Sequence, residues 1–273
     1  MKLILNQVDS TNLYKKIKLL KNGIILLIMI ILIIFKAEAY AHAQCELNHI
    51  AIIPDGNRRW AKENNLDSLE GHKEGFINTT PKVIEDLWNM GIHTVTIWGV
   101  STENWKRSEK EVANIMECID LLLKKMLPIA KNSKAKIIHI GRKDRLPAYL
   151  LKTLMFVENE TSSFDEHIFN FAIDFGGRDE IVRACQKTQK LKGSLDDITE
   201  EDISAAMDTA QQPFPLPDLI VRTSGEMRLS GFMAWQAIYS ELYFTKKYYP
   251  ALTRNDLEEA VESFNHRQRN YGK

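Results

Sequence analysis

Polar side chains that suit phosphate and metal binding gather directly after a short apolar run. The run 49–53 is followed by an acid, a glycine, an amide, two arginines and a tryptophan: Asp55, Gly56, Asn57, Arg58, Arg59 and Trp60. A glycine where a strand passes into a helix lets phosphate approach free backbone N–H groups, and arginines add charge-assisted hydrogen bonds. A carboxylate beside that phosphate is the oxygen ligand that Mg²⁺ prefers. Taken alone, the segment fits equally well a capping aspartate with two solvated arginines.

Two further polar segments also follow apolar runs. The first holds Ser101, Thr102, Glu103, Asn104, Trp105, Lys106 and Arg107, and the second holds Arg222, Thr223, Ser224, Gly225, Glu226, Met227, Arg228, Leu229 and Ser230. Two arginines and several hydroxyls around one glycine suit a second phosphate, although each segment alone could be a polar surface loop. Glu241 stands among aromatic residues, where a carboxylate needs a partner or a metal. Together these features predict two phosphorylated substrates and a divalent cation.

The elements that must position these residues alternate between apolar strands and amphipathic helices. The expected strands are 49–53, 94–100, 136–140, 168–173 and 218–221, and the expected helices lie between them. Repeated β-α units predict a single α/β domain with a mainly parallel six-stranded sheet and helices on both faces. Ligands of such folds bind beyond the carboxyl ends of the strands. The loops at residues 55, 101, 174 and 222 should therefore converge.

Helix signals are clearest after residue 107. Ser108 and Glu111 have the spacing of a capping box, and apolar residues recur at helical spacing from Val112 to Met126. This long helix could wall an apolar tunnel, although ordinary core packing is favoured for most of its residues. Further helices are expected at 76–90, 147–160 and 178–190, with Pro81 at a kink or at a helix start, and after Thr199 and Thr253.

Composition excludes some classes of protein. The 273 residues include 36 Lys+Arg and 36 Asp+Glu, so a broad basic face for nucleic acid is not indicated. The 44% hydrophobic content is enough for a substantial core. Three widely spaced cysteines without a CxxC pattern argue against a disulfide framework.

The first 44 residues form an extension that is set apart from the domain expected at 45–273. Four lysines between residues 15 and 21 precede the apolar run 24–35, and small residues follow at 39–43. This layout fits a secretory signal, an uncleaved anchor if the run extends from residue 19, or a translation start assigned too early. The lysines favour an N-terminus on the inner side. We expect a place at the cytoplasmic face, with membrane association through residues 19–35.

Several motifs together resemble those of the cis-prenyltransferase family, the undecaprenyl-diphosphate-synthase-like isoprenyl transferases. They are IIPDGNRRWAK, the Gly71-His72 pair, STENWKR, the turn at 175–178, RTSGEMRLSGFMAWQ, YSELYF and the C-terminal 269–272. The resemblance runs from His49 to the end of the chain, in family order and spacing. It implies an enzyme that condenses isopentenyl diphosphate with an allylic diphosphate, farnesyl or geranyl, as a homodimer with Mg²⁺.

The resemblance also implies roles for individual residues. Asp55 would bind Mg²⁺ and serve ionisation of the allylic diphosphate, and Glu241 would complete the metal site across the dimer. Asn104, supported by Ser101, would assist proton removal. The allylic diphosphate would be held by Gly56, Asn57, Arg58, Arg59 and His72. Isopentenyl diphosphate would be held by Arg222, Arg228 and Ser230, with Arg107 nearby. Trp60 and Trp105 would line the site, and Ser68, Thr102, Glu103 and Leu229 complete the expected substrate-binding set.

Three positions depart from the family pattern. Ser68 stands where many members have an arginine, Asp174-Phe175 replaces Asn-Tyr, and Pro54 replaces a common Met. We expect Ser68 to cost one phosphate contact and the extra carboxylate of Asp174 to disturb phosphate binding or to tune the metal. The product would be a polyprenyl diphosphate such as undecaprenyl diphosphate, or a short-chain, single-addition product. A non-catalytic partner subunit is disfavoured because the metal-binding aspartate and the phosphate-binding arginines are kept.

Overall fold

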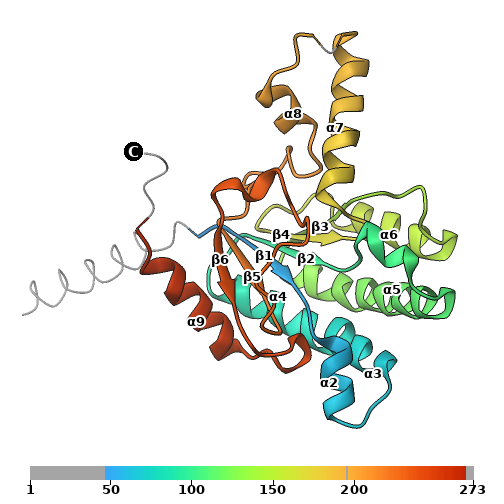
Figure 1. Cartoon of the computed structure of the whole chain (residues 1–273), viewed down its shortest axis with the longest axis vertical. Helices are drawn as coiled ribbons and strands as arrows, with labels where there is room; N and C mark the ends of the chain where they lie inside the picture. Colours follow the sequence, from blue (N-terminus) through green and yellow to red (C-terminus); the bar gives the residue numbers. More distant parts are fainter. Residues whose placement is uncertain (1–46, 195, 269–273) are drawn as a thin grey trace, which may run out of the picture. The chain divides into compact units, whose positions relative to one another are not determined.

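Six strands form one sheet, in the order β3-β4-β2-β1-β5-β6, and every neighbouring pair is parallel. The computed structural model describes residues 47–194 and 196–268 (Figure 1). The strands are β1 (His49–Ile53), β2 (Thr94–Trp98), β3 (Ala135–Ile140), β4 (His167–Ala172), β5 (Leu219–Arg222) and β6 (Glu241–Phe244). The prediction of a single α/β domain with six strands is confirmed, and no antiparallel pair occurs among the described strands.

The helices connect these strands. They are α2 (Asn57–Glu63), α3 (Ser68–Lys73), the π-helical segment η1 (Glu74–Thr79), α4 (Thr80–Asn89), α5 (Glu109–Asn132), α6 (Ala148–Glu160), α7 (Gly177–Lys192), α8 (Glu200–Ala206) and α9 (Arg254–Asn265). Short 3-10 turns are η2 (Thr102–Lys106), η3 (Gln236–Tyr239) and η4 (Tyr249–Ala251). Four helices cover the sheet: α9 contacts α4, α4 contacts α5, and α5 contacts α6. The helices α7 and α8 project from the sheet (Figure 1).

The sheet is buried because its strands are apolar on both sides. β1 is buried along its whole length, as expected for a central parallel strand. One core cluster joins Ala51 and Ile53 to Phe175, Phe232 and Met233. On that side the segment 229–239 covers the strands. It lacks the periodicity of an α-helix, so it was not among the elements expected from the sequence.

The helix expected near residues 76–90 is longer and contains a π-helical segment. α3, η1 and α4 run without a break from Ser68 to Asn89, with Pro81 in the first turn of α4. A proline has no N–H for the carbonyl four residues earlier, here that of Ile77. The Lys125 ammonium on α5 donates to that carbonyl at 2.8 Å. The Thr80 hydroxyl donates to the Gly75 carbonyl at 3.0 Å. Side chains thus satisfy the carbonyls at the π-helical segment.

Only half of the predicted capping box at α5 forms. The Ser108 hydroxyl accepts from the Glu111 N–H at 3.3 Å, but the Glu111 carboxylate does not return to the cap. It accepts instead from Arg107 at 2.9 Å and lies 3.8 Å from Arg58. The predicted helix start is confirmed, and the carboxylate that should have closed the box faces two arginines. The helix continues past Met126 and Pro128 to Asn132.

Candidate active site

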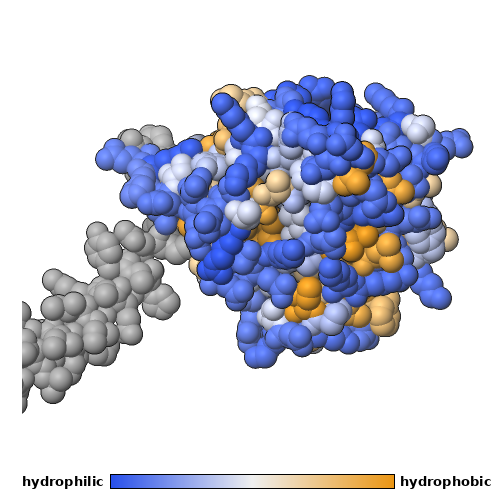
Figure 2. Space-filling view, turned by 90° about the horizontal axis from the view of Figure 1, so that it is seen from below, coloured by the Kyte–Doolittle hydropathy of each residue, from blue (hydrophilic) through white to orange (hydrophobic). Residues whose placement is uncertain are grey.

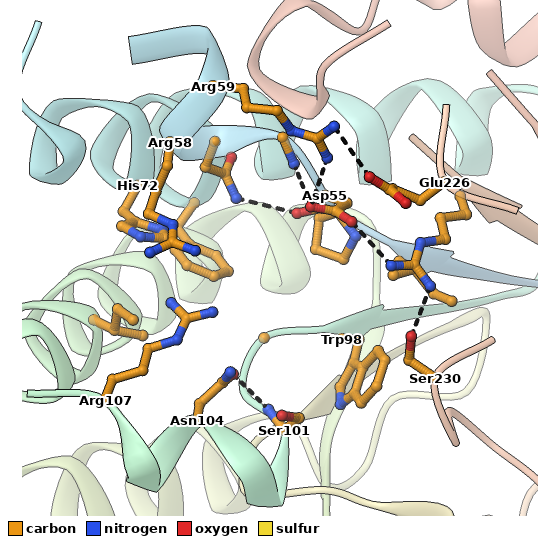
Figure 3. A pocket seen from close by; sticks show the side chains of 18 of the residues that line it. Asp55, Arg58, Arg59, His72, Trp98, Ser101, Asn104, Arg107, Glu226 and Ser230 are labelled. Carbon is orange, nitrogen blue, oxygen red and sulfur yellow. Dashed lines mark hydrogen bonds and ion pairs between the residues drawn. The ribbon is translucent and has the colours of Figure 1, made fainter. Parts of the chain in front are cut away.

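A pocket of about 470 Å³ opens at the carboxyl ends of three strands. Its lining includes Ile53 at the end of β1, Trp98 at the end of β2 and Arg222 at the end of β5. Figure 3 shows Arg58, His72 and Arg107 on one side of this space, with Asp55, Arg59 and Glu226 on the other. The predicted convergence of the loops after residues 55, 101 and 222 is therefore what the structure shows.

Gly56 shapes the turn between β1 and α2. Its φ of 103° lies in the left-handed region that favours glycine. A Cβ there would stand 2.6 Å from Cδ1 of Tyr248 and 2.9 Å from Cβ of Ser224. Gly56, and not Asp55, is the residue that precedes the helix, and no side chain caps it. The alternative that Asp55 is a simple helix cap is therefore wrong.

Asp55 lies between two arginines from distant parts of the chain. Its Oδ2 accepts from Nη2 of Arg222 at 3.0 Å, and its Oδ1 accepts from the Gly56 N–H at 2.7 Å and from Arg59 at 3.4 Å. The Arg222 guanidinium is nearly buried, with a residue exposure of 5%, and also donates to Oγ of Ser230 at 2.9 Å. A buried arginine that is held on two sides presents its charge in one fixed direction.

Arg59 belongs to a second set of contacts at the same edge. It donates to Oγ of Ser224 at 2.5 Å and to Glu226 at 3.2 Å, and its guanidinium lies 5.6 Å from the ring centre of Tyr248. Arg228 also donates to Glu226. The hydrogen bond from Arg228 lowers the pKa of the Glu226 carboxyl. Glu226 thus lies between two arginines of the pocket, a position that the mixed charges of its segment did not reveal.

Two glycines, one in α3 and one in η1, lie directly against Asn57. A Cβ at Gly71 would stand 2.1 Å from the Asn57 carbonyl oxygen, and a Cβ at Gly75 would stand 2.3 Å from its Oδ1. The Asn57 amide donates to the Pro54 carbonyl at 3.1 Å. The glycines therefore let α3 and η1 lie directly against the start of α2, which fixes the Asn57 backbone in the pocket wall.

His72 is a buried imidazole, and neither of its ring nitrogens has a hydrogen-bond partner among the described residues. It stacks on Phe76 with ring centres 6.2 Å apart. Burial, helped by the nearby charges of Arg107 and Arg58, lowers its pKa to about 4. At neutral pH the ring is uncharged, so it can donate one hydrogen bond to an anion in the pocket. Two unsatisfied buried nitrogens in a pocket wall are typical of a ligand contact.

The turn η2 carries Asn104 into the pocket. Oδ1 of Asn104 accepts from the Ser101 N–H at 2.9 Å, and the Ser101 hydroxyl closes a reciprocal capping box. This bond orients the carboxamide, so its NH₂ group remains for a ligand. Arg107 ends the turn and donates to Glu111 at 2.9 Å. Ser101 thus contacts Asn104 directly, and the predicted role of the two residues in proton removal stays a prediction.

Known proteins are similar to this chain in sequence. Residues 53–272 match the family described as "Putative undecaprenyl diphosphate synthase". The chain is 40% identical to the isoprenyl transferase of Fusobacterium nucleatum over 82% of this chain and 95% of that protein, and 40% identical to that of Treponema denticola over 83% and 98%. The chain belongs to this family. As an isoprenyl transferase it is an enzyme of prenyl-group transfer.

Two solved structures resemble this isoprenyl transferase. One is lavandulyl diphosphate synthase from Lavandula x intermedia in complex with dimethylallyl diphosphate, with a TM-score of 0.79 and 35% identity over 83% of this chain and 98% of that chain. The other is a probable undecaprenyl diphosphate synthase from Campylobacter jejuni, with a TM-score of 0.70 and 30% identity over 84% and 99%. The described fold is therefore the fold of these enzymes.

Most of the expected site residues of this isoprenyl transferase line the pocket, and some do not. The lining includes Asp55, Gly56, Asn57, Arg58, Arg59, His72, Ser101, Asn104, Arg107, Arg222, Arg228 and Ser230. The expected residues outside this lining are Trp60, Ser68, Thr102, Glu103, Trp105, Leu229 and Glu241. Ser68 borders an adjoining depression with Arg58 and Asp67, whereas Leu229 packs against the core. The direction of its side chain decides whether a predicted residue lines the pocket, and membership of a motif does not reveal that direction.

Seven lining residues were not foreseen as site residues: Ile53, Pro54, Phe76, Trp98, Gly99, Ile115 and Glu226. Phe76, Trp98 and Ile115 form apolar wall, and Glu226 lies between two arginines. Trp98 is the last residue of β2, and its position at a carboxyl strand end was a signal that could have found it. Phe76 and Ile115 lie in helical apolar stripes and look like ordinary core, so only packing reveals them.

The Asp55 carboxylate fits a Mg²⁺ ion that is shared with substrate phosphates. It is part-exposed in the pocket, with a side-chain exposure of 31%, and arginines surround it. Protein sites for Mg²⁺ commonly supply one or two carboxylates and leave other positions to phosphate and water. Within the described part of the chain, no group of three or more His, Cys, Asp or Glu side chains could hold a metal. In a site of this kind, phosphate oxygens and water would supply the other ligands.

Glu241 does not reach Asp55 within one chain. It is paired with Leu219 at the beginning of β5, whereas Arg222 at the pocket is paired with Phe244. Three residues of strand separate the two ends, roughly 10 Å. The Glu241 carboxylate accepts from Arg267 at 2.6 Å. A metal role for Glu241 therefore needs a second copy of the chain, and it stays a prediction.

Asp174 does not disturb phosphate binding through a free carboxylate, contrary to our expectation. It is fully buried and does not line the pocket. Arg145 donates to both of its oxygens, at 2.8 and 2.5 Å, and the Trp105 indole donates to Oδ1 at 2.8 Å. The charge that replaces the usual asparagine is thus neutralised by an arginine behind the pocket wall.

The predicted N-terminal extension, 1–44, lies outside the described residues, as does the C-terminal segment 269–272. In the ranges 47–194 and 196–268 no helix is long and apolar enough to cross a membrane. The proposed signal, anchor or early start therefore stays a prediction.

Proposed function

We propose that this isoprenyl transferase condenses isopentenyl diphosphate with an allylic diphosphate in cis, with Mg²⁺. The observation that carries the proposal is the contact between Asp55 and Arg222, which joins two cationic subsites at one carboxylate. Arg58, Arg59 and His72 would hold the allylic diphosphate on the α2 side. Arg222, Arg228 and Ser230 would hold isopentenyl diphosphate on the β5 side. Each subsite has fixed donors, as expected where negative charge develops during reaction.

The chemistry follows from charge and proton positions. The carbon–oxygen bond of the allylic diphosphate breaks, and diphosphate leaves with the electron pair. The isopentenyl double bond attacks the allylic carbon, and one proton passes from the new chain to the released diphosphate. Mg²⁺ held by Asp55 would neutralise charge on the departing diphosphate. Arg58 and Arg59 stabilise the same oxygens. The Asn104 carboxamide, oriented by the Ser101 N–H, would assist proton removal.

The direct test is product formation from labelled isopentenyl diphosphate. The enzyme is incubated with Mg²⁺ and with farnesyl, geranyl or dimethylallyl diphosphate, and products are separated by chain length. We expect incorporation that requires an allylic partner and stops with a chelator. Absence of label in any prenyl product under all three conditions would contradict the proposal.

A second candidate product, a short chain, is favoured by the pocket floor. Phe76 and Ile115 are 3% and 4% exposed, and Phe171 backs Phe76 with ring centres 6.5 Å apart. An undecaprenyl chain would need the floor to open. We expect F76A to lengthen the products if this wall limits growth, and an unchanged length distribution would remove that explanation.

A homodimer is proposed for this enzyme because Glu241 could then meet the partner's pocket. β6 is an edge strand of the sheet, and Ile238 and Tyr239 just before it are 76% and 66% exposed. A large exposed apolar side chain such as Ile238, beside the edge of the sheet formed by the described strands, favours a protein contact. Sedimentation equilibrium of wild type and of I238E/Y239E would test it, and a monomeric wild type would refute it.

Association with the cytoplasmic face of a membrane through residues 19–35 is also proposed, on sequence grounds alone. Mass spectrometry of the native N-terminus, with fractionation of the full chain against the chain from residue 45, tests it. Equal recovery of both chains in the membrane-free fraction would contradict it.

A further inference from the structure

Asp174 has an unusual position for a carboxylate. It follows β4, is 0% exposed and has a φ of 53°, in the left-handed region that Asp and Asn tolerate better than most residues. Among the described residues, two side chains donate hydrogen bonds to its carboxylate. Arg145 donates through Nε and Nη2, and Trp105 donates through Nε1. A buried charge is stable only when it is paired in this way.

Trp105 is held on its edge and on its face by the same pair. The Asp174 carboxylate accepts from the indole N–H, and the Arg145 guanidinium lies 5.7 Å from the centre of the ring. An arginine near an aromatic ring is attracted by the ring's negative face. Arg145 follows β3, so elements from three separate parts of the chain meet at this tryptophan.

The beginning of the turn that carries Asn104 contacts the segment that follows β4. Ser101 forms an isolated parallel bridge with Phe175, and a Cβ at Gly176 would stand 2.5 Å from Oγ1 of Thr102. These contacts hold the beginning of the turn. Trp105 is the next residue after Asn104, and its contact with Asp174 holds the later part.

We propose that Asp174 and Arg145 are a positioning pair that fixes Trp105 and thereby the direction of the Asn104 carboxamide. The proposal rests on the proposed role of Asn104 in proton removal. Neither Asp174 nor Arg145 lines the pocket. Loss of the pair should therefore slow the chemical step and leave diphosphate binding by Arg59 and Arg222 nearly unchanged. Misplacement of a catalytic group by about 1 Å can cost roughly a hundredfold in rate.

The test compares R145M, D174N and D174N/R145M. R145M leaves a buried carboxylate with Trp105 as its remaining side-chain donor, so we expect kcat to fall about tenfold to a hundredfold. KM for both diphosphates should stay within about threefold of wild type, as expected for an interaction that matters only in the transition state. In the double variant an asparagine can still accept from Trp105 and no charge is buried. We therefore expect it to recover most of the kcat lost in R145M.

A matched control separates positioning from general stability. Arg183 forms a similar bidentate contact with Asp208, at 2.9 and 2.7 Å, outside the pocket lining. R183M should lower the melting temperature as R145M does, yet leave kcat per folded molecule unchanged. A parallel fall in kcat in R183M would show that any lost ion pair has this effect, and would overturn the proposal.

Trp105 emission gives a readout that does not depend on turnover. The spectrum of each variant minus that of its W105F counterpart isolates this tryptophan among the five in the chain. We expect a shift to longer wavelength in R145M and a return in the double variant. Additive losses of kcat in the double variant, or an unchanged Trp105 spectrum in R145M, would refute the pair. If wild type forms no product, the proposed function fails, while the spectra still decide whether the pair holds Trp105.

Discussion

Nη2 of Arg222 lies 3.0 Å from Oδ2 of Asp55, although 167 positions separate the two residues in the chain. β1 and β5 are neighbours in the sheet, with Ile53 opposite Arg222. The pairing of these strands brings the carboxylate of one loop to the guanidinium of the other. One carboxylate therefore stands between the two proposed diphosphate subsites, and this position leads to the following predictions.

Replacing Asp55 should remove activity while leaving the fold. D55N keeps the size of the side chain but removes the charge beside Arg59 and Arg222, and it weakens any Mg²⁺ site. We expect kcat to fall by a factor on the order of 10² to 10³, as for the loss of a main electrostatic group. D144N provides the control, because Asp144 is 61% exposed and pairs with Arg142 outside the pocket lining. Steady-state kinetics measure kcat for both variants, and comparable values for D55N and D144N would contradict the mechanism.

Arg59 and Arg222 should affect different substrates. R59M should raise KM for the allylic diphosphate, and R222M should raise KM for isopentenyl diphosphate, because each loses a charge-assisted contact to one diphosphate. We expect about tenfold effects on the matched substrate and less than threefold on the other. KM values measured for both substrates with both variants form a crossed comparison. An equal effect of each variant on both substrates would show that the subsites are not separate.

Gly71 should be essential for stability because of close packing and not because of its φ. G71A would bring a Cβ to 2.1 Å from the Asn57 carbonyl, so α2 and α3 would have to move apart. Overpacking of this kind costs about 1–3 kcal/mol of unfolding free energy. E70A on the same helix is a matched control, since Glu70 is exposed and a change there costs within about 0.5 kcal/mol. Urea unfolding measures both, and a G71A value equal to that of E70A would contradict the packing argument.

Acid should destabilise the fold through buried histidines. Burial lowers the pKa of His49 to about 3 and that of His72 to about 4, from about 6.5 in the unfolded chain. Between pH 6.5 and 4 the unfolded chain therefore binds protons that the folded chain does not. The unfolding free energy should fall as pH falls, by about 1.4 kcal/mol per pH unit for each such histidine.

H72F isolates one of these contributions. Phenylalanine keeps a ring that can stack on Phe76, so we expect the variant to fold and to lose less stability than wild type between pH 6.5 and 4.5. H266Q is the control because His266 is exposed. Urea unfolding at the two pH values measures the difference. An unchanged pH dependence in H72F would show that His72 is not buried uncharged.

Several features could be predicted from residue types and spacing. Parallel β-α units, the three polar segments at strand ends, and the start of α5 at Ser108 all follow from local patterns. Local patterns were insufficient where distant residues compete for the same group. Glu111 has the spacing of a capping box, but its carboxylate meets Arg107 and Arg58. Asp174 looked like an added charge in the site, and Arg145 neutralises it behind the pocket wall.

The sequence by itself determined the family, the parallel sheet and which arginines belong to the pocket, because strand periodicity and motif spacing are local properties. Only the tertiary structure decided which members of each motif face the pocket. Asn104 does and Trp105 does not, although they are adjacent, because side-chain direction depends on what packs behind the turn. The structure likewise decided that Asp55 meets Arg222, since strand order in a sheet is set by packing of the whole chain.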